Sequence, residues 1–105
     1  MSRTNLEIHY TCTPEEARHK VEASMTIQGY QKTTYKNGEE AWTAGSGFFA
    51  LPKFIKFDYA PGVLHVTAWV CNALGGNELS IEKCPNFFAK RNLRNTLQKL
   101  MTLLQ

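Results

Sequence analysis

The chain has 105 residues, of which 43% are hydrophobic, 11% aromatic and 20% charged, and its formal net charge is +3 at pH 7. Domains commonly have ~100 to 150 residues, so the length predicts one domain over 1–105. This apolar and aromatic content excludes an intrinsically disordered chain. A charge of +3 is too small to indicate a nucleic-acid or membrane partner by itself.

The three cysteines do not predict a disulfide framework or a zinc ribbon. Cys12, Cys71 and Cys84 are odd in number, widely spaced and form no C-x-x-C pair, so we interpret them as reduced thiols. The segment 1–11 has no apolar signal-peptide core, and no apolar run approaches the ~18 residues of a membrane span. We therefore expect a soluble, cytoplasmic protein without a membrane partner.

The first elements are a strand and a helix. Apolar and polar residues alternate over 6–12, the period of a strand with one buried face. Thr13 then supplies an N-cap hydroxyl, a proline follows at the first helical position, and Glu16 stands three residues after the cap. These signals predict a helix over 14–28, ended by Gly29.

A hairpin follows the helix. Tyrosine and threonine recur up to Asn37-Gly38, the commonest two-residue hairpin turn, because both residues tolerate positive φ. A two-residue turn places Tyr35 on the same face as Trp42. It also predicts two cross-strand pairs, Lys36 with Glu39 and Thr33 with Trp42.

Three further elements are predicted in the second half. The segment 48–59 alternates, with Ile55, Phe57 and Tyr59 on one side, and Pro52 must lie at an edge or bend because it cannot donate to a ladder. A turn at 60–62 leads into 63–71, the most β-prone run and the expected central strand. Leu79 and Ile81 predict a short last strand.

Leucines at helical spacing predict a long amphipathic helix over 87–104. The expected class is α+β, in the order β-α-β-β-β-β-(β)-α: a single antiparallel sheet with both helices packed on one face. We expect Trp42 and Trp69 to serve the core or a half-buried sheet face.

The segment 45–50, GSGFFA, matches the G-x-G-x-x-(G/A) dinucleotide fingerprint. That motif requires a helix N-terminus directly after it to hold the pyrophosphate, whereas Leu51-Pro52 follows here. We interpret the segment as a bend or bulge between strands, and we predict no cofactor.

No catalytic or metal constellation stands out. His9, Cys12, His65 and Cys71 are scattered, and the first two face opposite sides of a strand, so we predict buried thiols and surface imidazoles and no metal site. Cys84 precedes a helix start, where the dipole lowers a thiol pKa, but no base is near it in sequence. The acidic pairs Glu15-Glu16 and Glu39-Glu40 are interpreted as solvated surface.

The C-terminal helix is basic. The segment 86–105 contains no acidic residue, and its cations are candidate contacts for an anionic partner: Lys90, Arg91, Arg94 and Lys99. Cations are also common on the solvated face of any helix and favourable in its last turns, so a purely structural role stays open.

Three segments carry a resemblance to a known family: EAWTAGSGF at 40–48, PKFIK at 52–56 and VTAWV at 66–70. Together with GGNEL at 75–79 and the start of the last helix, they resemble a globular domain that follows a zinc ribbon in a group of Firmicutes proteins. The resemblance covers 28–105 and implies a small bacterial α+β domain similar to the TATA-binding-protein-like (TBP-like) fold, with no established activity. Because this chain has no C-x-x-C ribbon, zinc binding is not carried over.

These observations favour a non-enzymatic binding or accessory domain whose contact surface is the open sheet face or the basic helix. One alternative is a nucleic-acid-associated protein that uses the four cations of the helix. Another is a module that binds a small ligand or lipid between the sheet and the long helix. The partner is unspecified, with a protein or an anionic molecule as the candidates, and an exposed edge strand that carries Pro52 is a candidate site of homo-oligomerisation.

Overall fold

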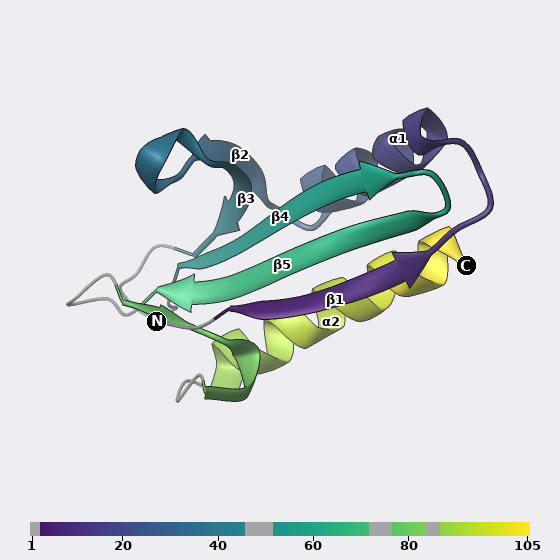
Figure 1. Ribbon diagram of the computed structural model, residues 1–105. Helices are drawn as coiled ribbons and strands as arrows, with labels where there is room; N and C mark the ends of the chain where they lie inside the picture. The colour runs from purple at the N-terminus through teal and green to yellow at the C-terminus, as the bar shows by residue number, and fades with distance from the viewer. Residues whose placement is uncertain (1–2, 46–51, 72–76, 84–86) are drawn as a thin grey trace.

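The protein is described by a computed structural model that covers residues 3–45, 52–71, 77–83 and 87–105. Within these ranges, six strands form one antiparallel sheet, and two helices lie on one face of it (Figure 1). The predicted α+β class and its general element order are therefore confirmed.

The sheet is built around β5 (Val63–Cys71). Its order is β1-β5-β4-β3-β2, with β6 also paired to β5. The remaining strands are β1 (Thr4–His9), β2 (Gln31–Thr34), β3 (Glu40–Ala44), β4 (Lys53–Ala60) and β6 (Glu78–Leu79). Since β5 pairs with β1, β4 and β6, the prediction that 63–71 is central is confirmed.

Helix α1 (Pro14–Ile27) begins and ends as the sequence predicts, to within one residue. The backbone N–H of Glu16 donates to the hydroxyl of Thr13 over 3.1 Å, which satisfies one of the free amides at the helix start. Gly29 has φ +87°, the left-handed conformation that terminates helices and that residues with a Cβ rarely adopt.

Helix α2 (Phe87–Leu104) closes the main core. One stripe of its leucines is buried against the sheet: Leu93, Leu97, Leu100 and Leu104. They meet apolar residues from the same sheet face, such as Ile8, Ile55 and Leu64. Apolar burial on this face is the main stabilising term of the fold.

One buried cation, Lys53, lies between the sheet and α2. Lys53, at the start of β4, is 7% exposed, and its Nζ donates to Oδ1 of Asn92 on α2 over 2.9 Å. Burial lowers the pKa of this amine. The contact links β4 to the second turn of the long helix.

The β2–β3 hairpin differs from its prediction by one residue of register. Its loop has three residues, the 3₁₀ turn η1 (Lys36–Gly38), in which Asn37 has φ +64°. The observed pairs are Gln31 with Thr43, Lys32 with Trp42, Thr33 with Ala41 and Thr34 with Glu40.

The predicted pairs of Lys36 with Glu39 and of Thr33 with Trp42 are therefore wrong. Because successive side chains point to opposite faces, the extra loop residue also places Tyr35 on the face opposite Trp42.

The predicted last strand is shorter than expected. Only Glu78 and Leu79 pair with β5, and the chain then turns into η2 (Ile81–Lys83), where the N–H of Lys83 donates to the carbonyl of Ser80 over 3.1 Å. The side chain of Ile81 is still buried in the core. Its backbone N–H donates to the hydroxyl of Thr4 on β1, which holds this turn against the sheet.

A second apolar cluster covers the other face of the sheet. Trp69 is fully buried there, stacked on Phe54 with ring centroids 5.6 Å apart, and Tyr35 meets it edge-on at 5.1 Å. The guanidinium of Arg3 lies 3.7 Å from the Trp69 ring centroid. Trp69 is thus a packing residue, as expected, although the helices do not cover it.

Arg3 also holds two carboxylates on this outer face. It donates to Glu39 over 2.9 Å and to Glu78 over 2.8 Å, and Lys56 reaches Glu39 at 3.0 Å. These hydrogen bonds lower the pKa of Glu39 to about 2 and also lower the pKa of Glu78. The prediction that Glu39 is simply solvated is therefore wrong, because a distant cation pairs with it.

Candidate functional site

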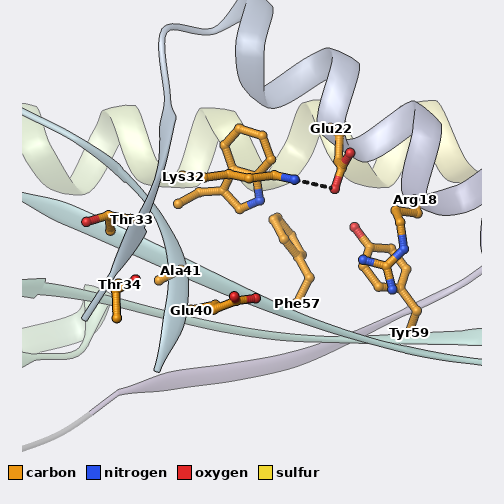
Figure 2. A pocket seen from close by; sticks show the side chains of 10 residues that line it. Arg18, Glu22, Lys32, Thr33, Thr34, Glu40, Ala41, Phe57 and Tyr59 are labelled. Atoms are coloured by element: carbon orange, nitrogen blue, oxygen red, sulfur yellow. Dashed lines mark ion pairs between the residues drawn. The ribbon is translucent and has the colours of Figure 1, made fainter. Parts of the chain in front are cut away.

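A pocket of about 310 Å³ opens beside α1, on the helix-covered side of β2, β3 and β4 (Figure 2). Its volume is at the lower end of the ~300 to 1,000 Å³ usual for small-molecule sites. The lining residues are Arg18 and Glu22 of α1, Lys32, Thr33 and Thr34 of β2, Glu40, Ala41 and Trp42 of β3, and Phe57 and Tyr59 of β4.

Three half-buried aromatic rings form the apolar part of the pocket. Trp42, Phe57 and Tyr59 alternate with outward-facing residues along their strands, so the pleat places all three on this face. Phe57 and Tyr59 have ring centroids 6.2 Å apart. All three side chains pack against the main core and are partly exposed, so some aromatic surface is open to a ligand.

Two cations lie over two of these rings. The Arg18 guanidinium is 4.4 Å from the Tyr59 ring centroid, and the Lys32 ammonium is 5.4 Å from that of Trp42. Such cation–π contacts hold long side chains in a defined position while their charged ends stay near water. The pocket therefore combines an aromatic floor with an oriented, charged rim.

The rim charges differ in their partners. Lys32 is paired with Glu22 across 3.0 Å. Arg18 and Glu40 form no ion pair within the part of the chain that the structure describes. Figure 2 shows these two side chains on opposite sides of Phe57. One cation and one anion are thus left to interact with a bound molecule.

Tyr59 remains a neutral phenol under ordinary conditions. Burial raises its pKa, and the nearby Arg18 cation opposes that rise only in part. The residue therefore offers an aromatic face and a hydroxyl group rather than a negative charge.

Sequence reasoning did not identify this pocket. A ligand site between the sheet and the long helix was one alternative, whereas the described lining of this pocket comes from α1 and three strands. The position of Lys32 beside Trp42 follows from the three-residue hairpin loop, which the Asn37-Gly38 signal did not reveal. The sequence signal that pointed toward the pocket was the placement of Phe57 and Tyr59 on the same face of one predicted strand.

The basic residues of α2 are only partly gathered. Lys90, Arg91 and Arg94 line, together with Asn95, a shallow surface hollow of about 270 Å³. Lys99 is exposed further along the helix and does not line this hollow. The negative charge of Glu82 lies near Arg94.

The histidines and cysteines that the structure describes do not converge on one site. No group of three metal-ligating side chains occurs among the described residues. His9 and His65 are exposed, Cys12 is half-buried at the core, and the buried Cys71 lies with its Sγ 3.1 Å from the Tyr35 hydroxyl. Residues 46–50 of the glycine-rich motif and Cys84 lie outside the described residues.

Fold and pocket together define a small α+β protein with a charged, aromatic pocket beside its shorter helix. When the chain was compared with protein-family models, curated proteins and solved structures, nothing matched it. Of the helices that the structure describes, none is both long and apolar enough to cross a membrane.

Proposed function

We propose that this chain is a cytoplasmic binding module without catalytic activity, and that a small ligand binds in the pocket beside α1. The observation that carries this proposal is the pairing of three accessible rings with two oriented cations around one cavity of about 310 Å³. Sites of this kind bind through apolar contact and a few placed polar groups.

The side chains around the pocket support recognition rather than reaction. The ten lining residues that the structure describes are aromatic, threonine, alanine or charged, and they include no histidine or cysteine. The two carboxylates, Glu22 and Glu40, lie on the rim of the pocket rather than in a desolvated cleft, which is the setting that general acid or base catalysis requires. We also propose, from the sequence resemblance alone, that the fold is TBP-like; a single antiparallel sheet with both helices on one face is the layout that this proposal requires.

The two tryptophans make the proposal testable. Trp42 lines the pocket, whereas Trp69 is buried on the opposite face of the sheet. A library of small aromatic compounds is screened by tryptophan fluorescence, and each compound that changes the signal is retested on Trp42→Phe. This variant keeps an aromatic ring in the floor and leaves Trp69 as the remaining tryptophan.

The expected result is at least one compound that changes the fluorescence of the natural protein and not that of Trp42→Phe. Two-dimensional NMR should place its largest shifts at Lys32, Phe57 and Tyr59. A screen without any compound of this kind would overturn the proposal. Shifts confined to α2 would also overturn it, in favour of the candidate below.

A second candidate function rests on the hollow lined by Lys90, Arg91 and Arg94. Three cations on one exposed surface suit the phosphates of a nucleic acid, and binding would then weaken steeply with salt because counterions are released. Arg91→Gln/Arg94→Gln should elute earlier from heparin than Lys20→Gln/Lys36→Gln, which removes the same charge elsewhere. Equal elution of the two variants would contradict this function.

A further inference from the structure

The two unpaired charges of the pocket restrict the chemistry of its ligand. Lys32 and Glu22 neutralise each other at 3.0 Å. The charges left for a ligand are then the Arg18 cation and the Glu40 anion, neither of which is ion-paired with another described residue. A molecule with a single charge would satisfy only one of them.

Arg18 is prepared to bind a carboxylate. Stacking of its guanidinium on Tyr59, at 4.4 Å, leaves the N–H groups around the edge of the plane free to donate. A planar guanidinium binds a carboxylate through two parallel hydrogen bonds, and it loses less conformational freedom when its orientation is already fixed.

Glu40 supplies the opposite charge at a separate position. It is the exposed first residue of β3, and Figure 2 shows Phe57 between it and Arg18. An ammonium group on the ligand would meet Glu40 while its carboxylate meets Arg18. The part of the ligand between the two charges would then lie on the ring of Phe57.

We infer, on the basis of the proposed function, that the ligand is a small zwitterion whose carboxylate and ammonium groups are separated by a flat apolar spacer. A spacer of this shape covers the accessible aromatic surface, and the two end charges match the two unpaired rim charges. An α-amino acid carries its two charges on one carbon, so it cannot span Phe57 in this way.

The test compares three probes of nearly equal size: 4-(aminomethyl)benzoate, 4-methylbenzoate and 4-methylbenzylamine. Each is titrated into the full chain, with NMR shifts at the pocket and calorimetry as readouts. The zwitterion should bind about tenfold more tightly than either probe with one charge, the effect of one additional charged hydrogen-bonded contact. Equal affinities for the three probes would overturn the inference.

Two variants assign each end of the probe. Arg18→Gln should weaken the binding of the zwitterion and of 4-methylbenzoate but leave that of 4-methylbenzylamine unchanged. Glu40→Gln should weaken the binding of the zwitterion and of 4-methylbenzylamine but leave that of 4-methylbenzoate unchanged. Lys99→Gln and Glu7→Gln make the same charge changes far from the pocket and should alter none of the affinities. Weakening of all probes by both variants, or by the distant controls, would contradict the assigned contacts.

Failure of this inference is distinguishable from failure of the proposed function. If other library compounds change Trp42 fluorescence while the zwitterion does not bind, the ligand class is wrong and the pocket remains a binding site. If no compound perturbs Trp42, both are wrong.

Discussion

Arg3 connects parts of the chain that are far apart in sequence. It stacks on Trp69 and donates to Glu39 in the hairpin and Glu78 beside β5, while its own side chain is only 25% exposed. Sequence reasoning assigned no role to this residue. Its position follows from the pairing of β1 with β5, which brings residue 3 next to Trp69.

Removing the Arg3 charge should destabilise the protein. Arg3→Met keeps an apolar chain over Trp69 but leaves two carboxylates without their donor, so we expect a loss of about 1.5 to 3 kcal/mol in the free energy of unfolding. Urea denaturation measures the loss. Lys20→Met, on the exposed side of α1, is the control and should change stability by less than about 0.5 kcal/mol.

The same cluster predicts acid sensitivity. The pKa of Glu39 is lowered from its ordinary 4.5 to about 2 by Arg3, and the pKa of Glu78 is shifted in the same direction. A carboxyl group whose pKa is lower in the folded state contributes stability above its unfolded pKa and loses it as the pH falls. Stability should therefore decline between about pH 4.5 and 2, and Arg3→Met should flatten that part of a pH series of urea midpoints.

Trp69 tests whether the outer face is part of the core. Trp69→Ala should cost about 3 to 5 kcal/mol, the usual loss for a fully buried large aromatic residue. Trp69→Phe should cost less, because it keeps a ring beneath Arg3 and removes an indole N–H that finds no hydrogen-bond partner in the described structure. A loss below about 1 kcal/mol for the alanine variant would show that the ring is exposed.

At the scale of elements, the hairpin loop decides which side chains share a face. With three residues between the paired positions, Lys32 lies beside Trp42 in the pocket, and Tyr35 lies on Trp69 outside it. A two-residue loop would have placed Tyr35 on the face of Trp42 and Lys32 on the opposite face. The pocket and the outer cluster thus both depend on one loop.

Asn37 should be the sensitive residue of that loop. Its φ of +64° is unfavourable for a β-branched residue, so Asn37→Val should destabilise the protein by about 1 to 2 kcal/mol. Asn37→Gly should be nearly neutral, since glycine adopts this conformation freely. Thermal unfolding of both variants checks the difference, and similar losses for the two would show that the backbone conformation is not the cause.

At the scale of the whole molecule, α2 covers the apolar face of the sheet and completes the main core. The helix has one buried and one exposed face, and each carries a leucine that can be compared with the other. Leu100 is fully buried, whereas Leu103 is 43% exposed. The core therefore depends on part of the helix surface, and the rest is free to carry the basic residues.

Leu100→Ala should lower the free energy of unfolding by about 2 to 5 kcal/mol, because it leaves a cavity in the core. Leu103→Ala should change it by less than about 0.5 kcal/mol. Chemical denaturation of the two variants measures the contrast. Equal effects would mean that the helix does not pack on the sheet as described.

The sequence by itself determined the elements whose signals are local. The capping residues around Thr13 and Gly29, the leucine spacing of α2 and the alternation in β4 and β5 each depend on neighbours within a few residues, and each predicted the presence and type of its element. Only the tertiary structure decided the hairpin register, the partners of Arg3 and the position of the pocket. These features depend on which distant strands pair, and local periodicity fixes a strand's two faces without fixing its neighbour.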